Sequence, residues 1–135
     1  MAIGEKLQKF YDNNHFVEAC NMELDKAEEG TAVMHMEIEP QHTNVYHFAH
    51  GGVLATLLDT AMGLAAAGVG RQIVTMNMNV SYIHSISVGE KAIATAKIVH
   101  SGHNTMVADA QVRNANGDLI AQSTGTLYVV GDMEK

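Results

Sequence analysis

The chain has 135 residues, 47% of them hydrophobic, and a formal net charge of −7. This length fits one domain with a substantial core, so we expect a single domain over residues 1–135. The negative charge, with no cluster of lysines and arginines, argues against a nucleic-acid partner. Cys20 is the only cysteine, which excludes an internal disulfide and a zinc site of several cysteines.

The same composition predicts where the protein works. Residues 1–16 carry charged side chains and no apolar run, so we expect no secretory signal. No stretch is apolar for long enough to span a membrane. We therefore expect a cytoplasmic protein that does not bind membranes.

The N-terminal part of the chain predicts one helix and two strands. Residues 4–14 have the apolar spacing of a short amphipathic helix. Residues 19–28 are a possible strand with weak patterning, and residues 32–39 alternate like a half-buried strand. The polar segment 39–49 has no periodicity and is expected to be a loop.

The middle of the chain holds the longest apolar segment. It opens with a His-Gly-Gly sequence at 50–52, and residues 51–67 show a wide apolar stripe at helical spacing. Asp59 is the only charged side chain from residue 51 to residue 70, and it points away from that stripe. An unpaired charge among apolar neighbours is costly. We therefore expect Asp59 to face a wet cleft where its charge is used; the alternative is a buried partner.

Beyond residue 71 the pattern is that of β-strands throughout. Apolar and polar residues alternate over 73–82, 92–99, 106–112 and from 119 onward. Turn signals separate these segments at 89–90, 101–104 and 114–118. Short turns of this kind predict four strands in an antiparallel meander. The expected fold is α+β, with a curved antiparallel sheet wrapped around one long central helix.

The start of the 51–67 helix offers a place for a carbonyl oxygen. The first N–H groups of a helix lack internal acceptors and carry partial positive charge. A carbonyl oxygen on the Gly51 N–H would be stabilised as it becomes an oxyanion. A carboxylate such as Asp59 could then deprotonate water or attack the carbon directly. The alternative is that the two glycines merely turn the chain.

A single helix cannot easily bring both the Gly51 N–H and the Asp59 carboxylate to the same carbonyl group of a substrate. Asp59 lies about 12 Å from Gly51 along the helix axis. Two chains packed about a two-fold axis can bring Gly51 of one to Asp59 of the other. We therefore predict that the active site spans a dimer interface. Small residues near Asp59 would let a second chain or loop cover that face: Ala55, Gly63 and Ala66.

We expect no metal ion in this site. His42, His47 and His50 lie close in sequence, but neither an HExxH motif nor a Cys/His ligand spacing is present. The sequence also has no G-x-S-x-G motif of serine hydrolases and no glycine loop for phosphate.

In combination, these motifs resemble the hotdog-fold acyl-CoA thioesterases of the phenylacetic-acid-degradation type and their relative, thioesterase superfamily member 2. The resemblance runs from about residue 43 to residue 130. Its core is Asn44, followed by His-Gly-Gly at 50–52 and then by Asp59. The strand segments 75–82 and 119–122 add to it.

The resemblance implies a hotdog fold and an enzyme that hydrolyses an acyl-coenzyme A to the free acid and coenzyme A. It implies no cofactor, since coenzyme A is part of the substrate. Asp59 matches the residue that acts as general base or nucleophile, and Gly51 matches the amide that polarises the carbonyl. Asn44 and His50 match residues that help to hold the thioester. Thr75 matches a residue that orients the water or the carboxylate.

The resemblance also implies where coenzyme A binds and how chains assemble. The residues matched to the substrate channel are Tyr82, His84, Ser85, Ser101, Gly102 and His103. Relatives form homodimers or dimers of dimers with shared sites. His103 stands where relatives often carry lysine or arginine. Either coenzyme A binds weakly here, or Arg71, Lys91 or Lys97 contacts the phosphates instead.

Two other functions stay open from the residues. A non-catalytic acyl-CoA-binding or fatty-acid-binding protein of the same fold would bind its ligand and release no thiol. A hotdog enoyl-CoA hydratase or dehydratase would pair His50 with a carboxylate in the same cleft.

Overall fold

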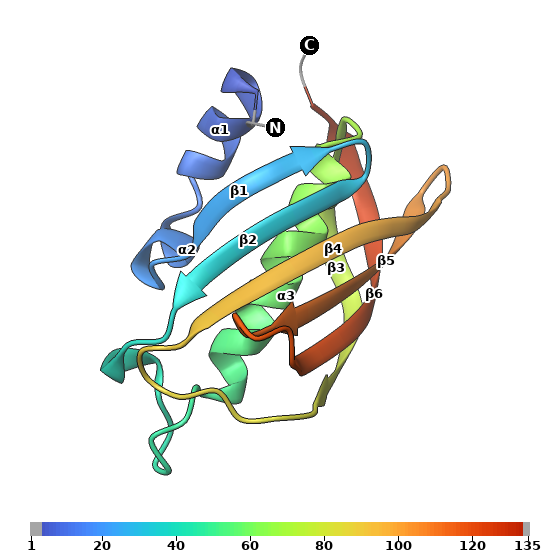
Figure 1. Ribbon diagram of the computed structural model, residues 1–135. Coiled ribbons are helices and arrows are strands. Elements are labelled where there is room, and N and C mark those ends of the chain that lie inside the picture. Colours follow the sequence, from blue (N-terminus) through green and yellow to red (C-terminus); the bar gives the residue numbers. More distant parts are fainter. Residues whose placement is uncertain (1–3, 134–135) are drawn as a thin grey trace.

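The computed structural model describes residues 4–133. Six strands form one antiparallel sheet in the order β1-β2-β4-β5-β6-β3, and the sheet curves around the long helix α3 (Figure 1). This confirms the fold class expected from the sequence. In chain order the elements are α1 (Glu5–Asp12), α2 (His15–Ala19), β1 (Glu23–Glu28), β2 (Thr31–Glu37), the 3-10 helix η1 (Pro40–His42), α3 (Gly51–Ala67), β3 (Arg71–Tyr82), β4 (Lys91–Ser101), β5 (Thr105–Arg113) and β6 (Leu119–Asp132).

Helix α3 is the core of the molecule. It packs against all six strands, and Leu57, Leu58 and Met62 are fully buried. A helix that is apolar on nearly every side must be enclosed in this way. The helix begins after His50, whose Nδ1 accepts the Gly52 N–H at 2.8 Å. None of the helices within residues 4–133 has the length and apolarity needed to cross a membrane.

The predicted four-strand meander is wrong at its first strand. Strands β4, β5 and β6 are sequential neighbours, but β3 pairs with β6 and β4 pairs with β2. Residues 83–90 do not form a hairpin; they cross the end of the sheet, held by a bridge between Phe48 and Ser87 and by buried Ile86. As a result β3 lies at one edge of the sheet.

The N-terminal predictions hold in part. The helix expected over 4–14 is α1, but the strand expected over 19–28 begins only at Glu23. The short helix α2 precedes it and was not predicted. The Asn14 side chain accepts the Val17 N–H, and Val17 is buried. Five residues are too few to show helical periodicity in the sequence.

A β-bulge in β3 breaks the regular alternation that the sequence predicts over 73–82. The pairing with β6 shifts between Thr75 and Asn77. Ile73 before the bulge and Met78 after it both pack against the core, whereas Met76 is 58% exposed. A bulge inserts one unpaired residue and so re-aims the side chains on either side of it. Thr75 therefore lies on the side of β3 that faces α3.

Tyr11 provides a test of how α1 packs. Its hydroxyl is buried without a hydrogen-bond partner in residues 4–133, and burial, followed by the charge of Asp12, raises the pKa of the phenol. Since a buried hydroxyl without a partner is destabilising, Tyr11→Phe should raise the free energy of unfolding by about 1 kcal/mol in urea denaturation. Tyr46→Phe, at an exposed loop position, is the control and should change stability by less than about 0.5 kcal/mol. A less stable Tyr11→Phe protein would show that the hydroxyl is hydrogen-bonded in solution.

Candidate active site

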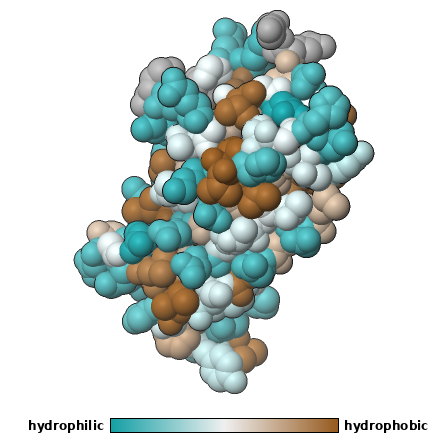
Figure 2. All heavy atoms as spheres, turned by 90° about the vertical axis from the view of Figure 1, so that its right-hand side faces the viewer, coloured by the Kyte–Doolittle hydropathy of each residue, from teal (hydrophilic) through white to brown (hydrophobic). Residues whose placement is uncertain are grey.

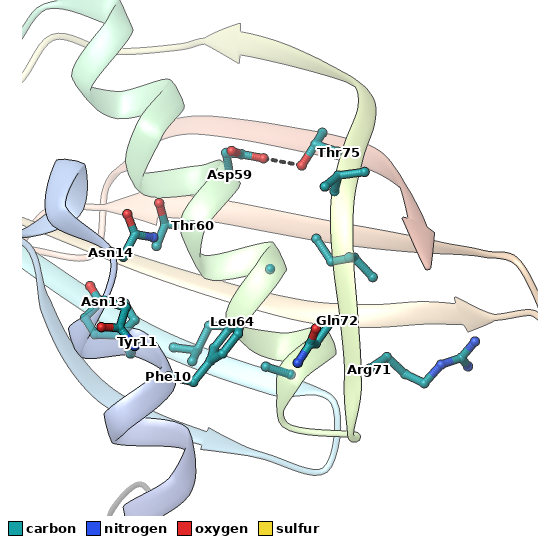
Figure 3. Close-up of a pocket in the computed structure, with 14 residues that line it drawn as sticks. Phe10, Tyr11, Asn13, Asn14, Asp59, Thr60, Leu64, Arg71, Gln72 and Thr75 are labelled. Carbon is teal, nitrogen blue, oxygen red and sulfur yellow. Dashed lines mark hydrogen bonds between the residues drawn. The ribbon is translucent and has the colours of Figure 1, made fainter. Parts of the chain in front are cut away.

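Asp59 and Thr75 form the first half of the candidate site. The Thr75 Oγ1 hydroxyl donates to Asp59 Oδ1 at 2.6 Å, joining α3 to β3 ahead of the bulge (Figure 3). Asp59 takes part in none of the ion pairs formed by residues 4–133. It lines a cavity of about 690 Å³ instead. The carboxylate therefore faces a cleft, as the sequence predicts.

The start of α3 forms the second half. Gly51 is the first residue of the helix, and its N–H has no hydrogen-bond partner in the part of the chain that the structure describes. The Tyr82 hydroxyl donates to the Gly51 carbonyl at 2.8 Å. A Cβ at residue 51 would lie 3.2 Å from the Tyr82 ring and hydroxyl, so glycine permits this close approach. The free N–H is thus held in a fixed place.

Asn44 and His50 hold their loop and still offer hydrogen-bond donors. The Asn44 Oδ1 accepts the N–H groups of Tyr46 and Phe48, at 2.9 and 3.2 Å, which leaves its NH₂ group available. Because Nδ1 of His50 already accepts the Gly52 N–H, the neutral ring carries its proton on Nε2. Both side chains can therefore donate to an oxygen.

The structure separates the two halves within one chain. Asn44, Gly51, Tyr82, His84 and Ser85 line a second cavity of about 300 Å³. This cavity shares no lining residue with the one beside Asp59 and Thr75. The straight helix keeps Gly51 and Asp59 about 12 Å apart along its axis. A single copy of the chain does not bring the predicted residues together.

The remaining predicted residues, Ser101, Gly102 and His103, lie at the end of β4 and in the turn to β5, and none of them lines either cavity. The Arg71 guanidinium donates to the carbonyls of Gly102 and His103, at 3.3 and 2.8 Å, and lies 3.7 Å from the Asp132 carboxylate. Arg71 is therefore already held by this turn.

Helix α1 supplies a wall that sequence reasoning did not place at the site. Phe10 and Tyr11 line the Asp59 cavity, as does Asn14 at the start of α2. Of the small residues expected beside Asp59, Gly63 lines this cavity but Ala66 is buried in the core. No local signal could have placed α1 here, because its contact with α3 joins distant parts of the chain. Across residues 4–133, no cluster of three or more His, Cys, Asp or Glu side chains is arranged to hold a metal ion.

Comparison with known proteins agrees with this architecture. Residues 46–121 match the family described as the thioesterase superfamily. Acyl-coenzyme A thioesterase 13 of Homo sapiens is 32% identical over 109 residues, which cover 78% of each chain. The structure of the PaaI protein from the phenylacetic acid degradation operon of Escherichia coli superposes with a TM-score of 0.90, at 26% identity, over 98% of this chain and 99% of that one.

A second solved structure carries a ligand. It is a Streptococcus mutans protein bound to acetyl CoA, with a TM-score of 0.82 and 31% identity over 84% of this chain and 92% of that one. With the family match over residues 46–121, these likenesses identify the curved sheet and long helix as a hotdog fold. The chain belongs to the thioesterase superfamily and is a thioester hydrolase.

Proposed function

We propose that this protein hydrolyses acyl-CoA thioesters at a site that two copies of the chain build together. Asp59 of one copy supplies the carboxylate, and Gly51 of the other supplies the amide that binds the carbonyl oxygen. The observation that carries the proposal is the division of these groups between two cavities with no common lining residue. The name of acyl-coenzyme A thioesterase 13 and the acetyl CoA bound to the Streptococcus mutans protein support the substrate class.

In this proposal Asp59 acts as general base or nucleophile. The Thr75 hydroxyl donates to Oδ1, which fixes the carboxylate and leaves Oδ2 free to face water or the thioester carbon. Water adds its oxygen to the acyl carbon, the carbon–sulfur bond breaks, and the products are the acid and coenzyme A. A thiolate leaves readily, so the reaction needs no strong general acid.

The other half of the site stabilises the carbonyl oxygen. The unpartnered Gly51 N–H lies at the positive end of α3, and such donors bind a developing oxyanion better than a neutral carbonyl. His50 Nε2 and the Asn44 NH₂ group add donors nearby. A hydratase would require His50 to accept a proton, but its Nδ1 is already occupied by the Gly52 N–H. The arrangement therefore supports hydrolysis over hydration.

A second copy has an exposed surface to occupy. β3 is an edge strand: it pairs with β6 on one side, and no other strand of residues 4–133 pairs with it on the other. Exposed apolar side chains lie on β3 and β6: Val74, Met76, Tyr128 and Val130. Figure 2, which looks at this side of the molecule, shows apolar side chains gathered in a patch. An open strand edge next to such a patch favours pairing with another chain. We propose a homodimer through this side, which further pairing could extend to a dimer of dimers.

The substrate channel stays a prediction. Tyr82, His84 and Ser85 lie at the Gly51 cavity, where the arm that carries the thioester would enter. Ser101, Gly102 and His103 are proposed to contact the nucleotide end of coenzyme A. Since Arg71 is held by that turn, we propose that Lys91 and Lys97 on β4 contact the phosphates instead.

Asp59→Asn tests the carboxylate. It removes the base or nucleophile but keeps the size of the side chain, so thiol release from acyl-CoA should fall about 10²- to 10⁴-fold. Thermal unfolding and coenzyme A binding should stay as in the wild type. Asp109→Asn is the matched control, because Asp109 also accepts a threonine hydroxyl, that of Thr124 at 2.8 Å, but lies on the exposed face of the sheet. Equal activity of the two variants would contradict the role of Asp59. Binding of acyl-CoA with no thiol release by the wild type would favour the non-catalytic alternative.

Gly51→Pro tests the amide. Proline lacks the N–H yet is favoured at the first residue of a helix, and the extended backbone of His50 suits a following proline. Gly51→Ala places a Cβ against Tyr82 as well but keeps the N–H, so it is the control. We expect Gly51→Pro to lose about 10²- to 10³-fold in kcat relative to Gly51→Ala.

Mixing the two inactive variants tests whether the site is shared. In a mixed dimer of Asp59→Asn and Gly51→Pro chains, one of the two shared sites has both wild-type groups. Random assembly should therefore restore about a quarter of wild-type activity. A co-expressed mixture that stays inactive would show that each site lies within one chain.

A further inference from the structure

The cavity beside Asp59 continues along α3 as a groove. Asp59, Gly63 and Ala67 follow one another at four-residue spacing, so they lie on one stripe of the helix. All three line the cavity, and the stripe is about 12 Å long. Its two small residues leave the groove open. A Cβ at residue 63 would meet only Ile73 Cδ1, at 3.6 Å.

The walls of this groove mix apolar side chains with uncharged polar ones, such as Asn13 and Gln72, and carry no charge between the two ends. Leu64 lies on the α3 side and Ile73 on β3, while the only charged lining residues are Asp59 and Arg71. In Figure 3 Asp59 lies at one end of the groove, and Arg71 lies at the other end with its side chain pointing away from α3. The Arg71 guanidinium is taken up by backbone carbonyls of the β4–β5 turn. The groove therefore suits an apolar chain whose reacting end lies at Asp59.

Phe10 of α1 forms the outer wall. It lies beside Leu64 at the groove and is 47% exposed, although it is a large aromatic side chain. Helix α1 has no buried residue and is held by the partial burial of Leu7 and Tyr11. Phe10 is not among the α1 side chains that pack against the core. An apolar chain in the groove would pack against the exposed Phe10 ring, and the contact would remove apolar surface of both from water.

We propose that this groove holds the acyl chain of the substrate and that Phe10 is a specificity-determining residue for chain length. This proposal rests on the proposed function, because Asp59 marks the reacting end. The occupant is the acyl chain, since the groove starts at the carboxylate and has no charge along its middle. Helix α1 lies outside residues 46–121, the part of the chain that matches the family.

The test compares octanoyl-CoA with acetyl-CoA by the ratio of their kcat/KM values for thiol release. In the wild type the ratio should exceed one, because each buried methylene is worth about fourfold in binding. Phe10→Ala should lower the ratio about tenfold. Gly63→Leu, which fills the groove, should lower it by at least about tenfold. Phe16→Ala is the control, because Phe16 is exposed on α2 and does not line the cavity, and it should leave the ratio unchanged.

The outcomes separate the two proposals. Suppose that the wild type releases thiol and that Phe10→Ala, Gly63→Leu and Phe16→Ala all have the same ratio of octanoyl-CoA to acetyl-CoA kcat/KM. This result would overturn the acyl groove and leave the proposed hydrolysis intact. No thiol release by the wild type from either ester would overturn the proposed function instead. In that case the affinity for octanoyl-CoA tests the groove. Tighter binding to the wild type than to Phe10→Ala would support the groove, and equal binding would overturn it.

Discussion

The burial of α3 is the constraint on which the rest of the structure depends. The helix is apolar on nearly every side, so the sheet must curl until its strands cover most of it. The one carboxylate of the helix can keep its charge only where this cover is incomplete. That place is the opening between edge strand β3 and helix α1, where Asp59 lines a cavity. The position of the cleft thus follows from where a charge is tolerated.

The fine geometry of the cleft depends on one irregularity in β3. Without the bulge after Thr75, the strand could not direct both Ile73 and Met78 toward the core, because they lie five positions apart and an odd spacing puts side chains on opposite faces of a regular strand. The bulge lets Thr75 face α3 and donate to Asp59, while Met76 turns outward to the exposed apolar patch. One inserted residue therefore shapes both the site and the surface proposed for the second copy.

The sequence predicts those features whose causes are local. The long helix, the sheet class and the strands after residue 71 follow from periodicity, and Asp59 stands out as a single charge in an apolar segment. The roles proposed for Asn44 and Thr75 came from the family resemblance, since spacing alone does not show them. Pairing of β3 with β6 could not be predicted, because Gly89 has the φ of a turn, +91°, whether or not the flanking strands pair. The bulge and the place of α1 also arise from contacts between distant segments.

Under our proposals, catalysis and acyl recognition are built in different ways. The two reacting groups lie on one rigid helix, which holds them apart, so only a second copy can bring them to the same thioester. The groove for the acyl chain, by contrast, is formed by α1, α3 and β3 of a single chain. Changes in α1 can therefore alter which acyl groups fit without disturbing the carboxylate or the helix start. Since Phe10 is 47% exposed, a change at this position also costs the fold little.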